Sequence, residues 1–83
     1  MGLFGFFKKK GASAEMQKRV QQHIAELDSP DAAVRLAACE GLRDLAPHSE
    51  PATERLLEMI NDPDGDVCNM ASQATTDIQA SLG

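Results

Sequence analysis

The chain contains no tryptophan and no tyrosine, and its 83 residues include only three phenylalanines and two cysteines. Without larger aromatic residues the core must be built from Leu, Ile, Val, Met and Ala, and the last two favour helices over strands. Two cysteines do not make a disulfide framework, so the composition favours a reducing, cytoplasmic setting. Cys39 and Cys68 are both expected within helices, as small buried apolar side chains.

The chain also lacks a long apolar run. Nothing in it approaches the roughly 20 apolar residues that a membrane-spanning helix needs. The opening MGLFGFFKKK places apolar residues before basic ones, which is the reverse of the order in a secretory signal. We therefore expect neither a membrane span nor a signal peptide.

Basic residues are scarce after residue 11. The first eleven residues hold three lysines and no acidic residue, whereas the remainder holds five basic and thirteen acidic residues, a net charge of −8. Nucleic-acid binding needs a basic face that neutralises phosphates. The acidic body of the chain is therefore not expected to bind DNA or RNA.

Apolar residues recur at helical spacing in four segments, and no segment has the pattern of a strand. The first helix is predicted from Ser13, as its N-cap, to about Leu27. The second is predicted to start at Ser29, as N-cap, with Pro30 at the first helical position, and to stop at Pro47. Short linkers predict that neighbouring helices run antiparallel.

The third helix is predicted to open at Ser49, again a cap before an early proline, and the fourth to follow the acidic turn at 61–66. The residues expected to form the buried stripes are Met16, Val20, Ile24, Leu27, Val34, Ala38, Gly41, Leu42, Leu45, Leu56, Leu57, Met59, Ile60, Val67, Met70, Ala71, Ala74, Ile78 and Leu82.

The chain repeats itself. Sliding it along itself until Leu27 falls on Ile60 aligns LDSPDAAVRLAACEGLRDL with INDPDGDVCNMASQATTDI, and we call this displacement the repeat shift. A fixed period between about 20 and about 50 residues is typical of helical solenoids, in which each helix–turn–helix unit stacks on the next.

The first of these runs resembles a HEAT repeat, of the short bacterial kind grouped with the HEAT-like repeats of phycobilin lyases. The resemblance rests on the apolar end of the first helix, the Asp/Pro-rich turn, "VR" early in the second helix, then "AA" and a Leu-x-x-Leu ending. It implies an all-α domain over 13–83, with repeats at about 14–46 and 49–82. The four helices would form two antiparallel hairpins, stacked as a short right-handed superhelix, and residues 1–12 a separate Phe/Lys-rich tail.

In such families a turn aspartate and an arginine early in the second helix form a ladder between stacked units. By resemblance, Arg35 is expected to bridge to Asp28, Asp62 or Asp64. The second unit has Cys68 where the family usually has arginine, as expected if nothing stacks beyond it. The residues expected on a polar outer face of the last helix are Ser72, Thr75, Thr76 and Gln79.

The acidic turn could be taken for a calcium loop, because Asp62, Asp64 and Asp66 stand at positions 1, 3 and 5 of an EF-hand. That loop needs Gly at position 6 and Glu at position 12, where this chain has Val67 and Gln73. A capped acidic helix start explains the aspartates better.

No other metal site or cofactor is expected, because the soft ligands lack paired spacing. The chain also has no nucleophile motif and no phosphate-binding glycine pattern, so we do not expect an enzyme. Phycobilin lyases need many more repeats to hold a chromophore. The soft ligands considered are His23, His48, Cys39 and Cys68.

In HEAT-like arrays the second helices line the concave side, where partners commonly dock. At 100° per residue this side presents an exposed Leu36 among charged and amide side chains, which suits a small interface. Ordinary solvated surface is the alternative. The candidate partner-binding residues are Leu36, Glu40, Arg43, Asn69, Gln73 and Thr76.

The N-terminus gathers all three phenylalanines and three lysines into a candidate tether. It could anchor to an anionic membrane, insert into a groove of a protein partner, or cover its own bundle or stay disordered. N-myristoylation would need Ser or Thr where Phe6 stands. The tether residues are Leu3, Phe4, Phe6, Phe7, Lys8, Lys9 and Lys10.

The sequence thus predicts a non-catalytic protein–protein interaction module, a small cytoplasmic adaptor or accessory subunit that binds another protein and carries a tether at residues 3–10. The alternative is a peripheral membrane-associated factor, held at the inner face of the membrane by the same segment.

Overall fold

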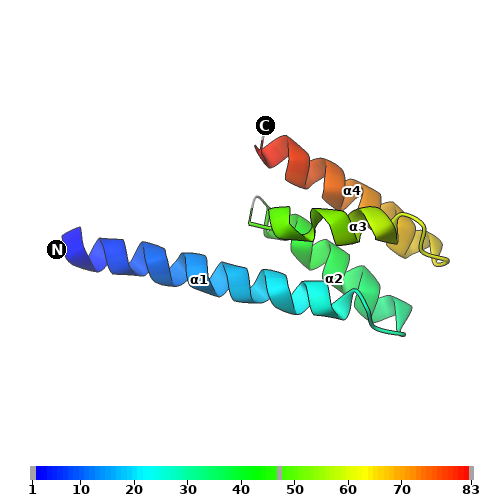
Figure 1. The fold of residues 1–83 in the computed structure, drawn as a ribbon, viewed down its shortest axis with the longest axis horizontal. Helices are drawn as coiled ribbons and strands as arrows, with labels where there is room; N and C mark the ends of the chain where they lie inside the picture. The colour runs from blue at the N-terminus through cyan, green and yellow to red at the C-terminus, as the bar shows by residue number, and fades with distance from the viewer. Residues whose placement is uncertain (1, 47, 83) are drawn as a thin grey trace.

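The computed structural model describes the backbone of residues 2–46 and 48–82 and the side chains of 14–46 and 48–82. These parts of the chain are helical and contain no strand, which confirms the predicted all-α fold with four helices (Figure 1). The elements are α1 (Gly2–Glu26), α2 (Ala32–Asp44), the 3-10 helix η1 (Glu50–Ala52), α3 (Thr53–Met59) and α4 (Gly65–Leu82).

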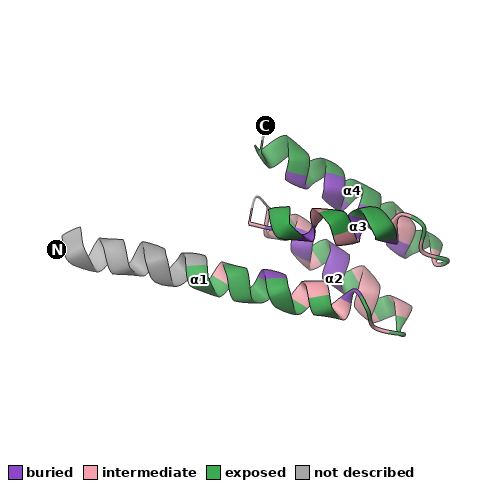
Figure 2. Cartoon of the chain, viewed as in Figure 1, coloured by how far each residue is buried: buried purple, intermediate pink, exposed green. Residues whose placement is uncertain are grey.

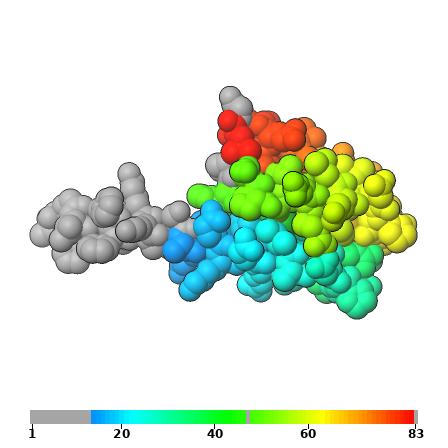
Figure 3. All heavy atoms as spheres, in the orientation of Figure 1, coloured from blue at the N-terminus to red at the C-terminus, as the bar shows by residue number. Residues whose placement is uncertain are grey.

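The helices pair as two hairpins, α1–α2 and η1–α3–α4. In each hairpin the second helix returns against the direction of the first (Figure 1). The most extensive helix–helix contact joins α2 to α4, so the hairpins stack through their second helices. The described atoms form one continuous body, in which α3 lies between α1 and α4 on the face in view (Figure 3).

The core lies where the four helices meet, and most of the predicted stripe residues are in it (Figure 2). Met16, Val34 and Gly41 are half-buried outside it. Leu57 and Leu82 are exposed, at 47% and 52%. The α3 helix has only seven residues, and its buried side is already filled by Leu56 and Met59. Leu82 is the last residue of α4, which is longer than α2 or α3. The buried apolar residues are Val20, Leu27, Ala38, Cys39, Leu42, Ala52, Leu56, Met59, Val67, Ala71, Ala74 and Ile78.

The predicted start of the first helix is wrong. Because α1 begins at Gly2, Ser13 lies inside the helix, and the expected boundary at residues 12 and 13 falls within α1. The intervening residues include no proline, and an interior glycine such as Gly11 costs only about 1 kcal/mol relative to alanine, which does not end a helix.

The N-cap of α2 is Asp31 and not Ser29. The Asp31 side chain accepts a hydrogen bond from the Ala33 amide at 2.9 Å, and Pro30 precedes the helix. A carboxylate caps as well as a hydroxyl does and gains from the helix dipole. Ser29 Oγ instead accepts from the Asp31 amide at 3.1 Å.

The second hairpin repeats this turn at the positions related by the repeat shift. Asp64 Oδ1 accepts from the amides of Asp66 (3.0 Å) and Val67 (3.2 Å) at the start of α4. Asp62 Oδ1 accepts from the Asp64 amide at 2.9 Å, in the place of the Ser29 hydroxyl. Both turns thus use an aspartate to satisfy the free amides of the helix that follows.

Two hydroxyls have roles other than those predicted. Ser49 makes no side-chain cap; it is buried, and its Oγ donates to the Leu42 carbonyl at 2.6 Å. That bond satisfies a free carbonyl near the end of α2. Thr75 is buried rather than part of a polar outer face, and its hydroxyl is satisfied because Oγ1 donates to the Ala71 carbonyl at 2.8 Å.

Candidate functional site

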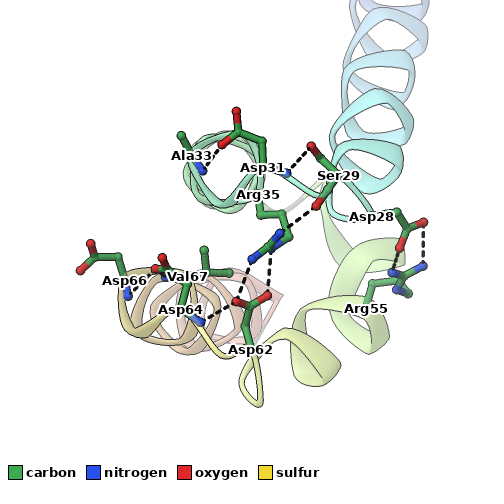
Figure 4. Close-up of polar contacts among 10 residues, drawn as sticks. All are labelled: Asp28, Ser29, Asp31, Ala33, Arg35, Arg55, Asp62, Asp64, Asp66 and Val67. Carbon is green, nitrogen blue, oxygen red and sulfur yellow. Dashed lines mark hydrogen bonds and ion pairs between the residues drawn. The ribbon is translucent and has the colours of Figure 1, made fainter.

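Arg35 joins the two hairpins. From the first turn of α2, its Nε and Nη2 donate to the two carboxylate oxygens of Asp62 at 3.0 and 3.2 Å, and its Nη1 donates to the Ser29 carbonyl at 2.8 Å (Figure 4). The side chains of Arg35 and Asp62 are 14% and 6% exposed. A planar guanidinium matches a carboxylate in this two-point geometry, which lysine cannot reproduce.

The environment of Asp62 favours its charged form. The Asp64 amide and then the Arg35 guanidinium hold the pKa of the Asp62 carboxyl below its usual value, although desolvation opposes them. Asp64 itself makes no bond to Arg35 and serves as the cap of α4. Of the aspartates proposed as acceptors, the structure thus brings only Asp62 to Arg35.

A second bridge runs between the hairpins from Arg55 on α3 to Asp28 in the α1–α2 turn (Figure 4). Arg55 Nε also lies 3.0 Å from Glu58 Oε1. The hydrogen bond from Arg55 lowers the pKa of Asp28, and Asp28 in turn raises the pKa of Arg55. Arg55 was missing from the expected ladder, although Asp28–Arg55 and Arg35–Asp62 share a separation of 27 residues.

The second hairpin has different residues at the positions equivalent to Arg35 and Cys39 of the first hairpin. At the position of Arg35 stands Cys68, whose Sγ lies 2.8 Å from the Ile60 carbonyl and is thereby occupied within its own hairpin. At the position of buried Cys39 stands exposed Ser72. Cys68 therefore makes no bridge equivalent to the one from Arg35 to Asp62.

The solvent-exposed side of the second helices forms a different surface, which we name the α2–α4 face. Arg43 crosses the seam between the helices, with Nη1 3.6 Å from Met70 Sδ and Nη2 3.7 Å from Asp44 Oδ1. The face consists of half-buried Leu36, Arg43 and Met70 with exposed Glu40, Asp44, Gln73 and Asp77.

The predicted partner-binding residues are only partly brought together. Leu36 is half-buried and packs against the core, so the prediction of an exposed leucine is wrong. Asn69 and Thr76 are exposed on the outer side of α4, where Thr76 Oγ1 donates to the Ser72 carbonyl at 3.0 Å. The predicted residues that do gather on the α2–α4 face are Leu36, Glu40, Arg43 and Gln73.

Met70 and Asp77 were not predicted to belong to this surface. Met70, Gln73 and Asp77 recur at spacings of three and four, so they share one side of α4. That spacing was visible in the sequence, but which side of α4 meets α2 follows only from the packing of the hairpins.

The α2–α4 face is acidic. Three carboxylates, Glu40, Asp44 and Asp77, stand against the single cation of Arg43. Among the described side chains Glu40 and Asp77 make no ion pair, and Arg43 pairs with Asp44 alone. The face therefore carries a net charge of −2 around the half-buried apolar side chains of Leu36 and Met70.

The thiol of Cys39 is buried in the core. Burial, with the charges of Asp62 and Glu40, raises the pKa of the Cys39 thiol to about 11, so that thiol stays protonated at neutral pH. Residues 14–46 and 48–82 enclose no pocket and assemble no group of three or more His, Cys, Asp or Glu that could hold a metal ion.

His23 and the tether complete the set of predicted residues. The His23 ring packs against Gly41 and its Nδ1 lies 2.8 Å from Glu26 Oε1, in a structural contact between α1 and α2. The side chains of residues 3–10 lie outside the described residues. No helix in the described residues is long and apolar enough to cross a membrane.

The comparison with known families bears on the first hairpin. The model of the HEAT repeat family matches residues 20–49, from the first core residue of α1 through α2 to the buried Ser49. No curated protein and no solved structure matches the chain. HEAT repeats generally mediate protein binding and are typically non-catalytic. Residues 20–49 thus contain a HEAT repeat, which suggests a protein-interaction scaffold.

Proposed function

We propose that this chain is a non-catalytic protein-interaction module, a small adaptor or accessory subunit. Its docking surface is the α2–α4 face, and residues 3–10 are a tether. The observation that carries the proposal is that this face extends across both hairpins, where Arg43 of α2 contacts Met70 of α4. Three carboxylates and one arginine surround its half-buried apolar residues. Charged groups around a partly apolar centre are typical of protein interfaces.

We further propose that the second hairpin is a second HEAT repeat, and that both hairpins are of the short bacterial kind. Several pairs of residues related by the repeat shift support this. Asp31 and Asp64 cap equivalent helices, and Ala38 and Ala71 are equivalent fully buried residues. The Arg35–Asp62 bridge then connects neighbouring repeats, as a ladder would.

The docking surface can be tested by capture and identification of partners with the full-length chain as bait. Glu40→Lys with Gln73→Lys adds three positive charges to the α2–α4 face. Glu54→Lys with Asn69→Lys adds the same three at exposed positions away from it and serves as the control. We expect the face variant to retain about a tenth or less of a specific partner, because its charge is reversed. Equal capture by both variants would remove this surface from the proposal.

Leu36→Asp is a poor probe of the same surface. Because Leu36 packs against the core, a charge there would destabilise the fold and lower capture for the wrong reason. The lysine substitutions change only exposed positions, and circular dichroism should show wild-type helicity for both pairs.

The second candidate function, a peripheral membrane-associated factor, is favoured by the order of residues in the tether. Phenylalanines can enter the interface of the bilayer, while each of Lys8, Lys9 and Lys10 gains about 1 kcal/mol from anionic lipid. Sedimentation with anionic liposomes separates the two functions. Salt-sensitive binding that is lost when these lysines become glutamine supports the membrane factor.

A further inference from the structure

We propose that residues 3–10 of one copy of this chain dock on the α2–α4 face of a second copy. The inference rests on the docking surface of the proposed function and identifies a first occupant for it. The geometry of the face, its charge and the composition of the N-terminal segment each contribute to the argument.

The α2–α4 face suits a segment that is both apolar and basic. Leu36 and Met70 are half-buried and leave part of their apolar surface at the seam between the helices. Glu40 and Asp77 lie beside that seam without an ion pair among the described side chains. A peptide that covers the seam and brings ammonium groups to these two carboxylates satisfies both features.

The chain itself contains such a segment. Residues 3–10, LFGFFKKK, combine one leucine and three phenylalanines with three of the eight basic residues of the chain. Clustered aromatic residues that stay in contact with water promote association, so a partner surface is needed for them. The segment carries +3 and the face −2, so their charges are complementary.

The occupant must come from a second copy. The α1 helix is continuous from Gly2 to Glu26, so the segment extends along the axis of α1 and does not turn back. Contact between α1 and α2 takes place where His23 packs on Gly41. Glu40 lies about 100° around α2 from Gly41, on the side turned toward solvent. The α1 helix, which packs at Gly41, therefore does not cover the α2–α4 face of its own chain.

Charge-swap sedimentation of the full-length chain tests the proposal. The tail variant carries Lys8→Glu, Lys9→Glu and Lys10→Glu; the face variant carries Glu40→Lys and Asp77→Lys. We expect the wild type to self-associate as its concentration rises, and each variant alone to associate at least about tenfold more weakly. An equimolar mixture should recover association, because acidic tails then meet basic faces and basic tails meet acidic faces.

Salt and a free peptide give independent measurements. Raising the salt from about 0.1 M to about 1 M shortens the Debye length from about 10 to about 3 Å and should weaken wild-type association. A peptide of residues 1–12 should shift the NMR signals of Met70 and Gln73 in the full-length tail variant, whereas a peptide of scrambled order should not. This second measurement stands even where the face variant does not fold.

Three results would overturn the inference: a monomeric wild type at every concentration, a mixture that stays dissociated, or a peptide that leaves the α2–α4 face unperturbed. A monomer that binds anionic vesicles through Lys8–Lys10 would assign the segment to lipid instead. If the mixture stays dissociated but Glu40→Lys with Gln73→Lys abolishes capture of a partner, the proposed function stands and the self-docking falls.

Discussion

The two hairpins have the same arrangement of turn and second helix. They differ at the equivalent positions that, in the first hairpin, contact the second hairpin. Both place an aspartate at the start of the second helix and a fully buried alanine further along it, at Ala38 and Ala71. At other equivalent positions the first hairpin has groups that reach the second, such as Arg35, whereas the second has Cys68, which bonds within its own hairpin.

This difference separates the residues that two hairpins share from those that join one hairpin to the other. The capping aspartates Asp31 and Asp64 and the buried alanines Ala38 and Ala71 recur, because each hairpin must start its second helix and bury one side of it. Residues that join the hairpins, such as Arg35 and Asp62, lie where the two hairpins meet. Substitutions at equivalent positions should therefore have unequal effects.

The largest contrast is expected between Cys39→Asp and Ser72→Asp, at positions related by the repeat shift. Cys39 is fully buried in the core, so an unpaired carboxylate there should cost about 3–5 kcal/mol and unfold the chain. Ser72 is exposed, so the same change should shift the free energy of unfolding by no more than about 0.5 kcal/mol. Thermal melts followed by circular dichroism measure both, and similar melts would contradict the assignment of the two faces.

The next effect concerns the bridge at Arg35. Arg35→Gln leaves the Asp62 carboxylate without its main cationic partner and should cost about 2–3 kcal/mol in urea unfolding. Cys68→Gln, the equivalent change in the second hairpin, should cost clearly less because Cys68 has no partner across a hairpin boundary. Arg35→Gln combined with Asp62→Asn should recover part of the loss; a strictly additive loss would mean that the pair is not coupled.

A smaller effect is expected at Gly41, whose equivalent in the second hairpin is the buried Ala74. A Cβ at Gly41 would lie 2.5 Å from His23 Nε2, whereas the equivalent of His23 is Leu56. Gly41→Ala should lower stability by about 1 kcal/mol despite the better helix propensity of alanine. His23→Leu with Gly41→Ala copies the second hairpin and should restore the melt. A stabilising effect of Gly41→Ala alone would contradict this expectation and would mean that the His23 ring can move away from the new Cβ at little cost.

The smallest effect is expected from acid. The pKa values of Asp28 and Asp62 are lowered in the native chain, so these carboxylates stabilise it fully above their ordinary pKa of about 4. Their contribution is lost as the pH falls through the native values, below about 4. Asp62→Asn should flatten the dependence of Tm on pH in this range, and Asp77→Asn, outside both bridges, serves as the control. If Tm depends on pH in Asp62→Asn as it does in the wild type, the Arg35–Asp62 bridge does not contribute to the loss of stability in acid.

Much of the fold could be predicted, because it depends on local periodicity. The helical spacing of apolar residues that predicted Val20, Leu27, Ala38 and Ala71 as core residues follows from about 3.6 residues per turn. This spacing does not depend on distant parts of the chain. Helix starts were less predictable, since Ser29 and Asp31 can both cap and only the path of the turn selects between them.

The sequence by itself determined that the chain is helical, that two of its stretches are alike and that its body is acidic, because periodicity, internal similarity and charge follow from the order and kind of the residues alone. Only the tertiary structure decided that Arg35 meets Asp62, that Arg55 meets Asp28 and that Met70 and Asp77 join Glu40 on one face. Those contacts depend on how one hairpin is seated on the other. That arrangement is set by the packing of α2 against α4, which brings together residues that no local pattern connects.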